Sequence, residues 1–262
     1  MIDYVHIVSY WEGNNRLSNL KKHSEFVKNE LNNIKSKLVI FVIRCNDLNN
    51  IKIKNELNII KNKMKIDIVV LYKYNSGGTV KSLEDGYKYL KENGIDFKYI
   101  SCSEDDYCFI DNKFLEKANK YLNNGNIFVG SLWPESYHKI TEDGIKFGEN
   151  CVSFDRRICP HIKMKHIKNT ENDKEKYIDD SLYRWCEDPY ITTKNNLEEI
   201  INKLERLTLA PEDELYTATE HGVNYGEVGF PTRLHLNNFK FIGILKKNII
   251  KHLDVKSNSI WR

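Results

Sequence analysis

The chain has 262 residues, of which 40% are hydrophobic and 29% are charged. These proportions are those of an ordinary globular protein, and an aromatic content of 11% excludes a wholly disordered chain. The 40 basic and 37 acidic residues leave a formal net charge of +3. This near balance argues against a dedicated nucleic-acid binder, because such domains carry a strong excess of positive charge.

The beginning of the sequence and its cysteines predict a cytoplasmic protein. Residues 4–8 form too short an apolar run for a signal peptide and lack a basic start. No apolar run approaches the ~20 residues that a membrane span needs. The six cysteines form no Cys-x-x-Cys pair, so we expect free thiols in a reducing compartment. Cys159, His161 and His166 lack the paired spacing of zinc ligands.

The first half of the sequence alternates short apolar runs with segments of helical periodicity. The clearest strand is 38–43, because it has six consecutive apolar residues, four of them β-branched. Further strands are expected at 4–10, 66–72, 97–101 and 127–130, and helices at 16–34, 51–63, 79–93 and 112–122. Continuous apolar strands that alternate with helices predict an α/β fold with a mainly parallel central sheet, flanked by helices on both faces.

The second half has a less regular pattern. Residues 133–175 are rich in charge and histidine, and we expect an irregular region there with short strands, one of them at 151–154. Helices are expected at 174–187, 195–206, 212–222 and 245–253. The sequence contains no linker that would separate two units, so we predict a single domain over 1–262.

Polar and small residues follow each of the expected strands. Ligands of open α/β sheets bind outside the carboxyl ends of the strands, so these residues are candidates for a binding site. They are Ser9, Tyr10 and Glu12 after the first strand, Asp47 after the second, Asn75, Gly77 and Gly78 after the third, and Glu104, Asp105 and Asp106 after the fourth. Such a set is what a nucleotide bound with a divalent metal requires.

The segment Ser103-Glu104-Asp105-Asp106-Tyr107 is the sharpest feature of the sequence. Three adjacent carboxylates at a strand end repel one another unless a cation offsets them. Hard divalent cations often take one or two carboxylates together with substrate phosphates. A solvated acidic turn is the alternative, since charged loops are commonly surface. The position directly after a buried strand favours the cation site.

These segments together resemble the nucleotide-sugar half of GT-A glycosyltransferases, most nearly glycosyltransferase family 2. The resemblance rests on Ile7-Val8-Ser9-Tyr10, on Asn75-Ser76-Gly77-Gly78 before a helix that carries Gly86-Tyr87, and on the acidic segment. It covers 4–132 well and 207–235 more thinly, and 140–205 lies outside it. It implies a Rossmann-like GT-A fold, with 1–132 as the nucleotide-sugar-binding half and a less regular C-terminal half, 133–262, for acceptor binding and catalysis.

In that family the acidic segment is the DxD motif, whose last Asp holds a divalent metal, Mn or Mg, that bridges the donor diphosphate. The resemblance implies Asp105 and Asp106 as metal ligands. Ser103 stands where the first Asp is usual, which leaves the ribose contact without its residue unless Glu104 supplies it. Lys81, one helical turn beyond Gly77-Gly78, would face a phosphate.

Two residues of the second half are implied as further site residues. Pro211-Glu212-Asp213-Glu214-Leu215 resembles the family's Glu-Asp-x-x-Leu segment, in which the Asp is the general base of an inverting transfer. A helix N-terminus is a compatible alternative for this segment. His235 would complete the metal site, or is a structural histidine.

Other candidates have a structural alternative too. The resemblance implies that Asp47 lies near the base or ribose of the donor, and a turn with Asn46 is the alternative. Trp11, Trp133 and Tyr137 are candidates for stacking, or are buried aromatics.

The sequence thus predicts a metal-dependent glycosyltransferase that moves a sugar from a nucleotide-diphosphate sugar to an acceptor hydroxyl, on a glycan or another molecule. We expect neither a nucleic-acid partner nor a transmembrane segment. Two alternatives stay open. A non-catalytic nucleotide-sugar-binding domain would explain Ser103. A sugar nucleotidyltransferase would carry a Gly-rich loop with Arg after the first strand, where this chain has Ser9-Tyr10-Trp11-Glu12.

Overall fold

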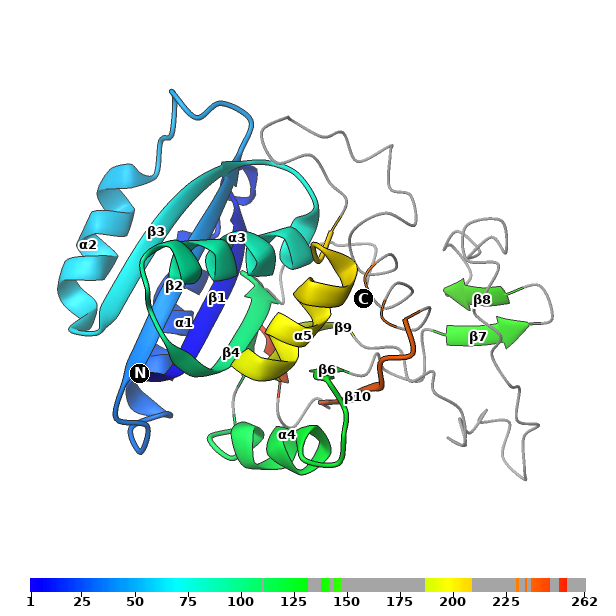
Figure 1. Cartoon of the computed structure of the whole chain (residues 1–262). Helices are drawn as coiled ribbons and strands as arrows, with labels where there is room; N and C mark the ends of the chain where they lie inside the picture. Colours follow the sequence, from blue (N-terminus) through cyan, green and yellow to red (C-terminus); the bar gives the residue numbers. More distant parts are fainter. Residues whose placement is uncertain are drawn as a thin grey trace, which may run out of the picture.

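The computed structural model describes residues 1–109, 111–131, 138–141, 144–147, 187–208, 230, 234, 237–245 and 250–253. They form an α/β structure on a seven-stranded sheet of order β10-β6-β9-β4-β1-β2-β3 (Figure 1). The strands are β1 (Ile2–Trp11), β2 (Lys37–Cys45), β3 (Asp67–Tyr74), β4 (Phe97–Glu104), β6 (Phe128–Ser131), β9 (Glu187–Thr193) and β10 (Phe241–Leu245). All pairs in the sheet are parallel except those of β9 with β4 and β6. The predicted fold class, a mainly parallel sheet flanked by helices, is confirmed.

Helices cover both faces of the sheet. They are α1 (Leu17–Asn29), α2 (Lys54–Met64), α3 (Gly78–Glu92), α4 (Phe114–Leu122) and α5 (Lys194–Leu204), and a short 3-10 helix, η1 (Glu12–Asn14), follows β1. Two small antiparallel pairs lie outside the main sheet: β5 (Tyr107–Phe109) with β11 (Ile250–His252), and β7 (His138–Thr141) with β8 (Gly144–Phe147).

Within the described part of the chain, the length and apolarity needed to cross a bilayer are not combined in any helix.

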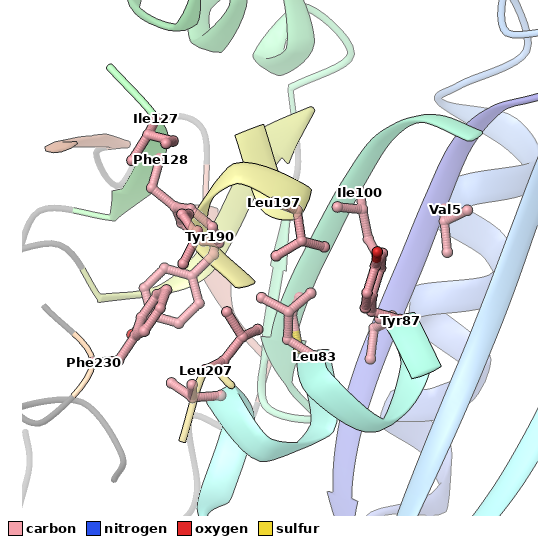
Figure 2. Close-up of a cluster of buried hydrophobic side chains, with 14 of the residues drawn as sticks. Val5, Leu83, Tyr87, Ile100, Ile127, Phe128, Tyr190, Leu197, Leu207 and Phe230 are labelled. Atoms are coloured by element: carbon pink, nitrogen blue, oxygen red, sulfur yellow. The ribbon is translucent and has the colours of Figure 1, made fainter. Parts of the chain in front are cut away.

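The core has two layers, one on each face of the sheet, because side chains alternate along each strand. In β2, Val39, Phe41 and Ile43 pack with α1, α2 and α4, whereas Leu38, Ile40 and Val42 pack with α3 and α5. The apolar run at 38–43 is therefore buried on both sides, as a strand inside a covered parallel sheet must be. Figure 2 shows the second layer, in which Leu83 of α3 and Leu197 of α5 meet aromatic side chains of the C-terminal half.

The helix predicted over 245–253 is wrong. Leu245 ends β10, which pairs with β6, and residues 250–252 form β11, which pairs with β5. Apolar residues in so short a segment fit the period of a helix as well as that of a strand. Here they form strands because they pair with β6 and β5. The helix predicted over 174–187 is wrong at its last residue, since β9 begins at Glu187. The rest of that helix, the strand at 151–154 and the helix at 212–222 lie outside the described residues.

Strand β9 was not predicted, although it lies inside the sheet between β4 and β6. Proline normally excludes a segment from a central strand, because it has no N–H to donate to the ladder, and Pro189 stands in the middle of β9. The register between β6 and β9 shifts at this point, with Val129 opposite Ile191 but Ser131 opposite Glu187. The irregularity accommodates the proline, and the regular ladder with β4 begins only at Tyr190.

Candidate functional site

The polar residues that follow the strands come together at one edge of the sheet. In the parallel registers, Ser9 of β1 lies opposite Glu104 of β4, Trp11 opposite Arg44 of β2, and Cys45 opposite Tyr74 of β3. The carboxyl ends of four strands therefore form one continuous edge. This is the placement that the sequence predicted, and it is where ligands of such sheets bind.

The acidic segment ends β4 and turns directly into β5. The strand runs on to Glu104, three residues further than predicted, and Asp105 and Asp106 form the turn before Tyr107. Ser103 is fully buried, Asp105 and Asp106 are 3% and 9% exposed, and Glu104 is partly exposed. A solvated acidic turn would leave its carboxylates in water, so this alternative does not describe the segment.

Three residues from two other parts of the chain, α1 with the residue before it and the segment after β11, hold the acidic turn. Nη1 of Arg16, the residue before α1, lies 2.9 Å from Oδ2 of Asp106 and 3.9 Å from Oδ1 of Asp105. From α1, His23 Nε2 contacts the Asp105 carbonyl oxygen at 3.1 Å. The Leu253 amide, just after β11, donates to the Asp106 carbonyl at 2.6 Å. One cation thus lies within 4 Å of both carboxylates, which shows that the two side chains converge on a common point.

A chain of buried hydrogen bonds leads through the core to this turn. The Tyr4 hydroxyl lies 2.6 Å from Ser101 Oγ, Ser101 Oγ lies 2.7 Å from His6 Nδ1, and His6 Nε2 lies 2.9 Å from His23 Nδ1. Because the Asp105 carbonyl can only accept, His23 Nε2 carries its proton. Each neutral imidazole then accepts at Nδ1 and donates at Nε2, so Ser101 donates to His6 and His6 donates to His23.

Burial keeps both histidines neutral. It lowers the pKa of His23 to about 4. It also lowers the pKa of His6 well below its ordinary value, and the neighbouring His23 adds to this effect. These two imidazoles therefore support the acidic turn through hydrogen bonds, and they bring no positive charge to it at neutral pH.

Glu104 connects the acidic segment to the start of α3. Its Oε1 accepts a hydrogen bond from the Thr79 hydroxyl at 3.3 Å. Gly77 and Gly78 precede Thr79 with φ of 62° and 57°, a left-handed conformation that favours glycine. A Cβ built on Gly78 would meet no atom within 4 Å, so space is open beside this backbone. The loop 75–78 and Glu104 thus border the same part of the edge, as a donor-binding role for both requires.

The candidates at the end of β1 have hydrogen-bond partners within the protein. Ser9 accepts a hydrogen bond from Ser82 at 2.8 Å. The Tyr10 hydroxyl accepts from the Arg16 amide at 3.1 Å, and burial raises the pKa of Tyr10 to about 12. Glu12 accepts from the Lys52 amide at 2.6 Å. All three bonds fix the edge around the acidic turn.

Asp47 is exposed, and its Oδ1 accepts from the Asn49 amide at 2.9 Å. The turn interpretation of Asp47 therefore describes its contact, and its contact with a base or ribose stays a prediction. The Asn75 amide donates to the Cys45 carbonyl at 3.1 Å, which ties the loop after β3 to the end of β2.

Lys81 differs from its expected surroundings. The side chain is 1% exposed, and its Nζ lies 3.0 Å from Glu84 Oε1 and 3.2 Å from Asp85 Oδ1. An ammonium held between two carboxylates inside the protein has its charge already offset. Contact of Lys81 with a donor phosphate stays a prediction, and the contacts seen here are structural.

Asp213, His235, Trp133 and Tyr137 lie outside the described residues, so their roles also stay predictions. In the described ranges, no group of three or more His, Cys, Asp or Glu side chains is arranged to hold a metal ion. The donor set that does exist is the pair Asp105 and Asp106. Two hard oxygen ligands suit a Mg or Mn ion that completes its sphere with water and substrate phosphates.

Arg16 and His23 were not predicted as site residues, although the sequence of α1 and of the residue before it carries a signal for them. Arg16, Asn19 and His23 are spaced by three and four residues, which places them on one side of a helix. Asn19 and His23 are buried. Polar residues on the buried side of an otherwise amphipathic helix indicate a polar partner, and for Arg16 and His23 that partner is the acidic turn.

Comparison with solved structures gives matches to 67 chains, two of which follow. The chain is similar to 4-diphosphocytidyl-2C-methyl-D-erythritol synthase, with 11% identity and a TM-score of 0.38 over 90% of this chain and 99% of that one. It is also similar to the apo form of mouse xyloside xylosyltransferase 1, with 8% identity and a TM-score of 0.37 over 93% and 85%. No protein-family model matches the sequence, and a search of curated proteins gives no match. The α/β assignment therefore rests on the strand order of this chain itself.

Proposed function

We propose that this chain is a metal-dependent glycosyltransferase of the GT-A type, which transfers a sugar from a nucleotide-diphosphate sugar to an acceptor hydroxyl. The observation that carries the proposal is the acidic turn. Asp105 and Asp106 are buried and converge on one point at the carboxyl edge of a mainly parallel sheet. The open space beside Gly78 borders this edge through Thr79 and Glu104.

In this proposal Asp105 and Asp106 hold the divalent metal. The residues present fit such an ion, because Asp105 and Asp106 bring two formal negative charges to one point and the Arg16 guanidinium offsets only one of them. When bound, a divalent ion offsets the charge that develops on the leaving diphosphate. Glu104 is the carboxylate left to contact the ribose, since it is partly exposed whereas Ser103 is fully buried.

Acceptor activation is proposed for Asp213 on the resemblance alone. An inverting transfer needs one carboxylate that takes the proton of the acceptor hydroxyl while that oxygen attacks the anomeric carbon. Asp213→Ala is expected to lower the transfer rate by about 100-fold or more. Full activity of this variant in a transfer assay would show that another mechanism operates.

The proposal is tested by release of nucleoside diphosphate from a panel of nucleotide sugars in the presence of Mn. The wild-type chain is expected to release diphosphate from at least one donor. Asp105→Asn is expected to lower that rate by about 100-fold, because it removes a negative ligand from the metal site.

A matched control is Asp67→Asn, which changes an exposed aspartate at the start of β3, far along the strand from the carboxyl edge. Its rate should equal that of the wild type. Binding of a donor without any release would support the non-catalytic alternative. Equal rates for wild type and Asp105→Asn would refute the proposed role of the acidic turn.

A further inference from the structure

Four charged side chains are buried together between α3 and the end of β2. Arg44 Nη2 lies 2.8 Å from Asp85 Oδ2, Lys81 Nζ lies 3.2 Å from Asp85 Oδ1, and Lys81 Nζ lies 3.0 Å from Glu84 Oε1. The side chains of Arg44 and Lys81 are 2% and 1% exposed, and those of Asp85 and Glu84 are 7% and 11% exposed. Two cations and two carboxylates leave this quartet formally neutral.

Such a quartet contributes little net free energy to the stability of a fold. Taking each ion out of water carries a large free-energy cost, and apolar residues of the same volume often stabilise a protein more. Burial indeed lowers the pKa of Arg44, and Asp85 is the main influence that raises it again. The better-attested use of buried ions is to fix one arrangement of the chain against others.

One end of the quartet reaches the carboxyl edge. Arg44 Nε donates to Ser82 Oγ at 3.0 Å, and Ser82 donates to Ser9 at 2.8 Å. Arg44 Nη1 donates to the Tyr74 carbonyl at 3.3 Å. The guanidinium thus joins the ends of β1, β2 and β3 to α3, directly beneath the residues proposed to bind the donor.

The other end reaches a segment far away in the sequence. Glu84 Oε2 accepts hydrogen bonds from two consecutive backbone amides, Leu207 at 2.7 Å and Thr208 at 2.9 Å. Both residues are fully buried, and the Leu207 side chain packs near Leu83 in the apolar cluster of Figure 2. Hydrogen bonds from backbone amides to a charged acceptor are stronger than those to a neutral one, so the carboxylate holds the chain firmly as it leaves α5.

We propose that Glu84 is a positioning residue, which sets the path of the chain at 207–208 relative to the donor-binding edge. The inference rests on the proposed function, because Thr208 stands five residues before Asp213, the proposed base. With one carboxylate oxygen on Lys81 and the other on two amides, Glu84 connects the proposed acceptor side of the molecule to its donor side.

The test compares Glu84→Asp with wild type. Aspartate keeps the charge of the quartet, but it is one methylene shorter and cannot reach both Lys81 and the two amides. Hydrogen exchange at the Leu207 and Thr208 amides is expected to quicken by about tenfold or more, while exchange in β1 and β2 stays unchanged. In the transfer assay kcat should fall about tenfold or more, with KM for the donor within about twofold, because positioning of the acceptor side is lost and donor binding is kept.

Glu92→Asp is the matched control, since Glu92 is exposed on the same helix, and it should leave exchange and kinetics unchanged. If Glu84→Asp does not fold, Glu84→Gln keeps the length of the side chain and removes its charge. Exchange at Leu207 and Thr208 should still quicken and kcat should still fall, because a neutral acceptor holds the two amides more weakly. Unchanged exchange at 207–208, or faster exchange with an unchanged kcat, overturns the proposal. A wild-type chain that transfers no sugar refutes the proposed function instead, and the exchange result then still decides whether Glu84 holds this segment.

Discussion

At the scale of single residues, the acidic turn depends on neutral groups as much as on charges. Arg16 supplies positive charge to Asp105 and Asp106, but the backbone of the turn is held by His23, a buried imidazole without charge. Behind it, His6, Ser101 and Tyr4 continue the chain of hydrogen bonds. A proton added to either imidazole would remove an acceptor that its neighbour needs.

The buried histidines predict a stability that falls in acid. In the unfolded chain a histidine titrates near pH 6.5, whereas burial lowers the pKa of His23 to about 4 in the folded protein. Below pH 6.5 the unfolded state therefore binds a proton that the folded state does not. The free energy of unfolding should decrease between pH 6.5 and 4, by roughly 3 kcal/mol for His23 alone, and His6 adds to this decrease.

Urea unfolding at pH 7.5 and at pH 4.5 measures this effect. In His23→Gln, which keeps a donor and an acceptor but does not titrate, the decrease between the two pH values should be smaller by about 2–3 kcal/mol. The carboxylates of the chain contribute equally to both proteins and cancel in the comparison. An equal decrease in wild type and variant would show that His23 is not the titrating group.

At the scale of elements, helix α3 connects the proposed donor site, the buried charged side chains and strand β1. Its first turn borders the proposed donor site, its middle carries the buried ions, and Gly86 lets it approach β1 closely. A Cβ built on Gly86 would lie 2.4 Å from Cδ1 of Ile7. The glycine therefore sets how near α3 lies to the strand ends beneath the site.

This close approach predicts a coupling between Gly86 and Ile7. Gly86→Ala is expected to lower the free energy of unfolding by about 1–2 kcal/mol, because the extra methyl overpacks a fully buried side chain. In an Ile7→Val background, which lacks Cδ1 but keeps both Cγ atoms, the same change should cost clearly less, since the 2.4 Å contact is gone and alanine is the better helix former by about 1 kcal/mol. A double-mutant cycle in urea reports the difference. Equal costs in both backgrounds would contradict the predicted contact.

The elements also show where sequence patterns stop being sufficient. Strand β2 was predictable because six apolar residues in a row need burial on both faces. Strand β9 was not, because Pro189 is typical of an edge or a loop and only a register shift next to β6 admits it. Residues 245–253 have apolar positions that fit a helix, and they became strands because partners were available. The local sequence pattern determines the secondary structure of a segment with a long apolar run. In other segments, pairing with a neighbouring strand determines it.

At the scale of the whole molecule, the near-neutral net charge of +3 conceals an uneven distribution. Carboxylates gather in the acidic turn at the carboxyl edge, and a second pair is neutralised inside α3 by Arg44 and Lys81. The first group keeps formal negative charge that can attract a divalent cation, because Arg16 alone faces Asp105 and Asp106. The second group is formally neutral, because two cations face its two carboxylates. A ligand for this protein should therefore combine a metal with an anion.

This distribution predicts that nucleoside diphosphates stabilise the chain only together with Mn. Uridine, guanosine and thymidine diphosphate should be compared in thermal unfolding, each with and without the metal. Saturation at 100 times Kd stabilises the folded state by about 2.7 kcal/mol, which is roughly a 5–10 °C rise in Tm for a chain of this size. The nucleotide that gives the rise identifies the donor class. Equal shifts without Mn would refute the metal dependence.

The sequence by itself determined the alternating strands and helices of the first half, and with them the edge at which Ser9, Glu104 and the two aspartates meet. It could do so because buried parallel strands need long apolar runs, and such runs can be read locally. Only the tertiary structure decided which groups contact these residues. Arg16 and His23 reach the acidic turn, and Glu84 reaches residues 207–208, across sequence separations that no local pattern encodes. A polar group buried without a hydrogen-bond partner costs free energy, so each of these side chains pairs with a group that the fold places beside it.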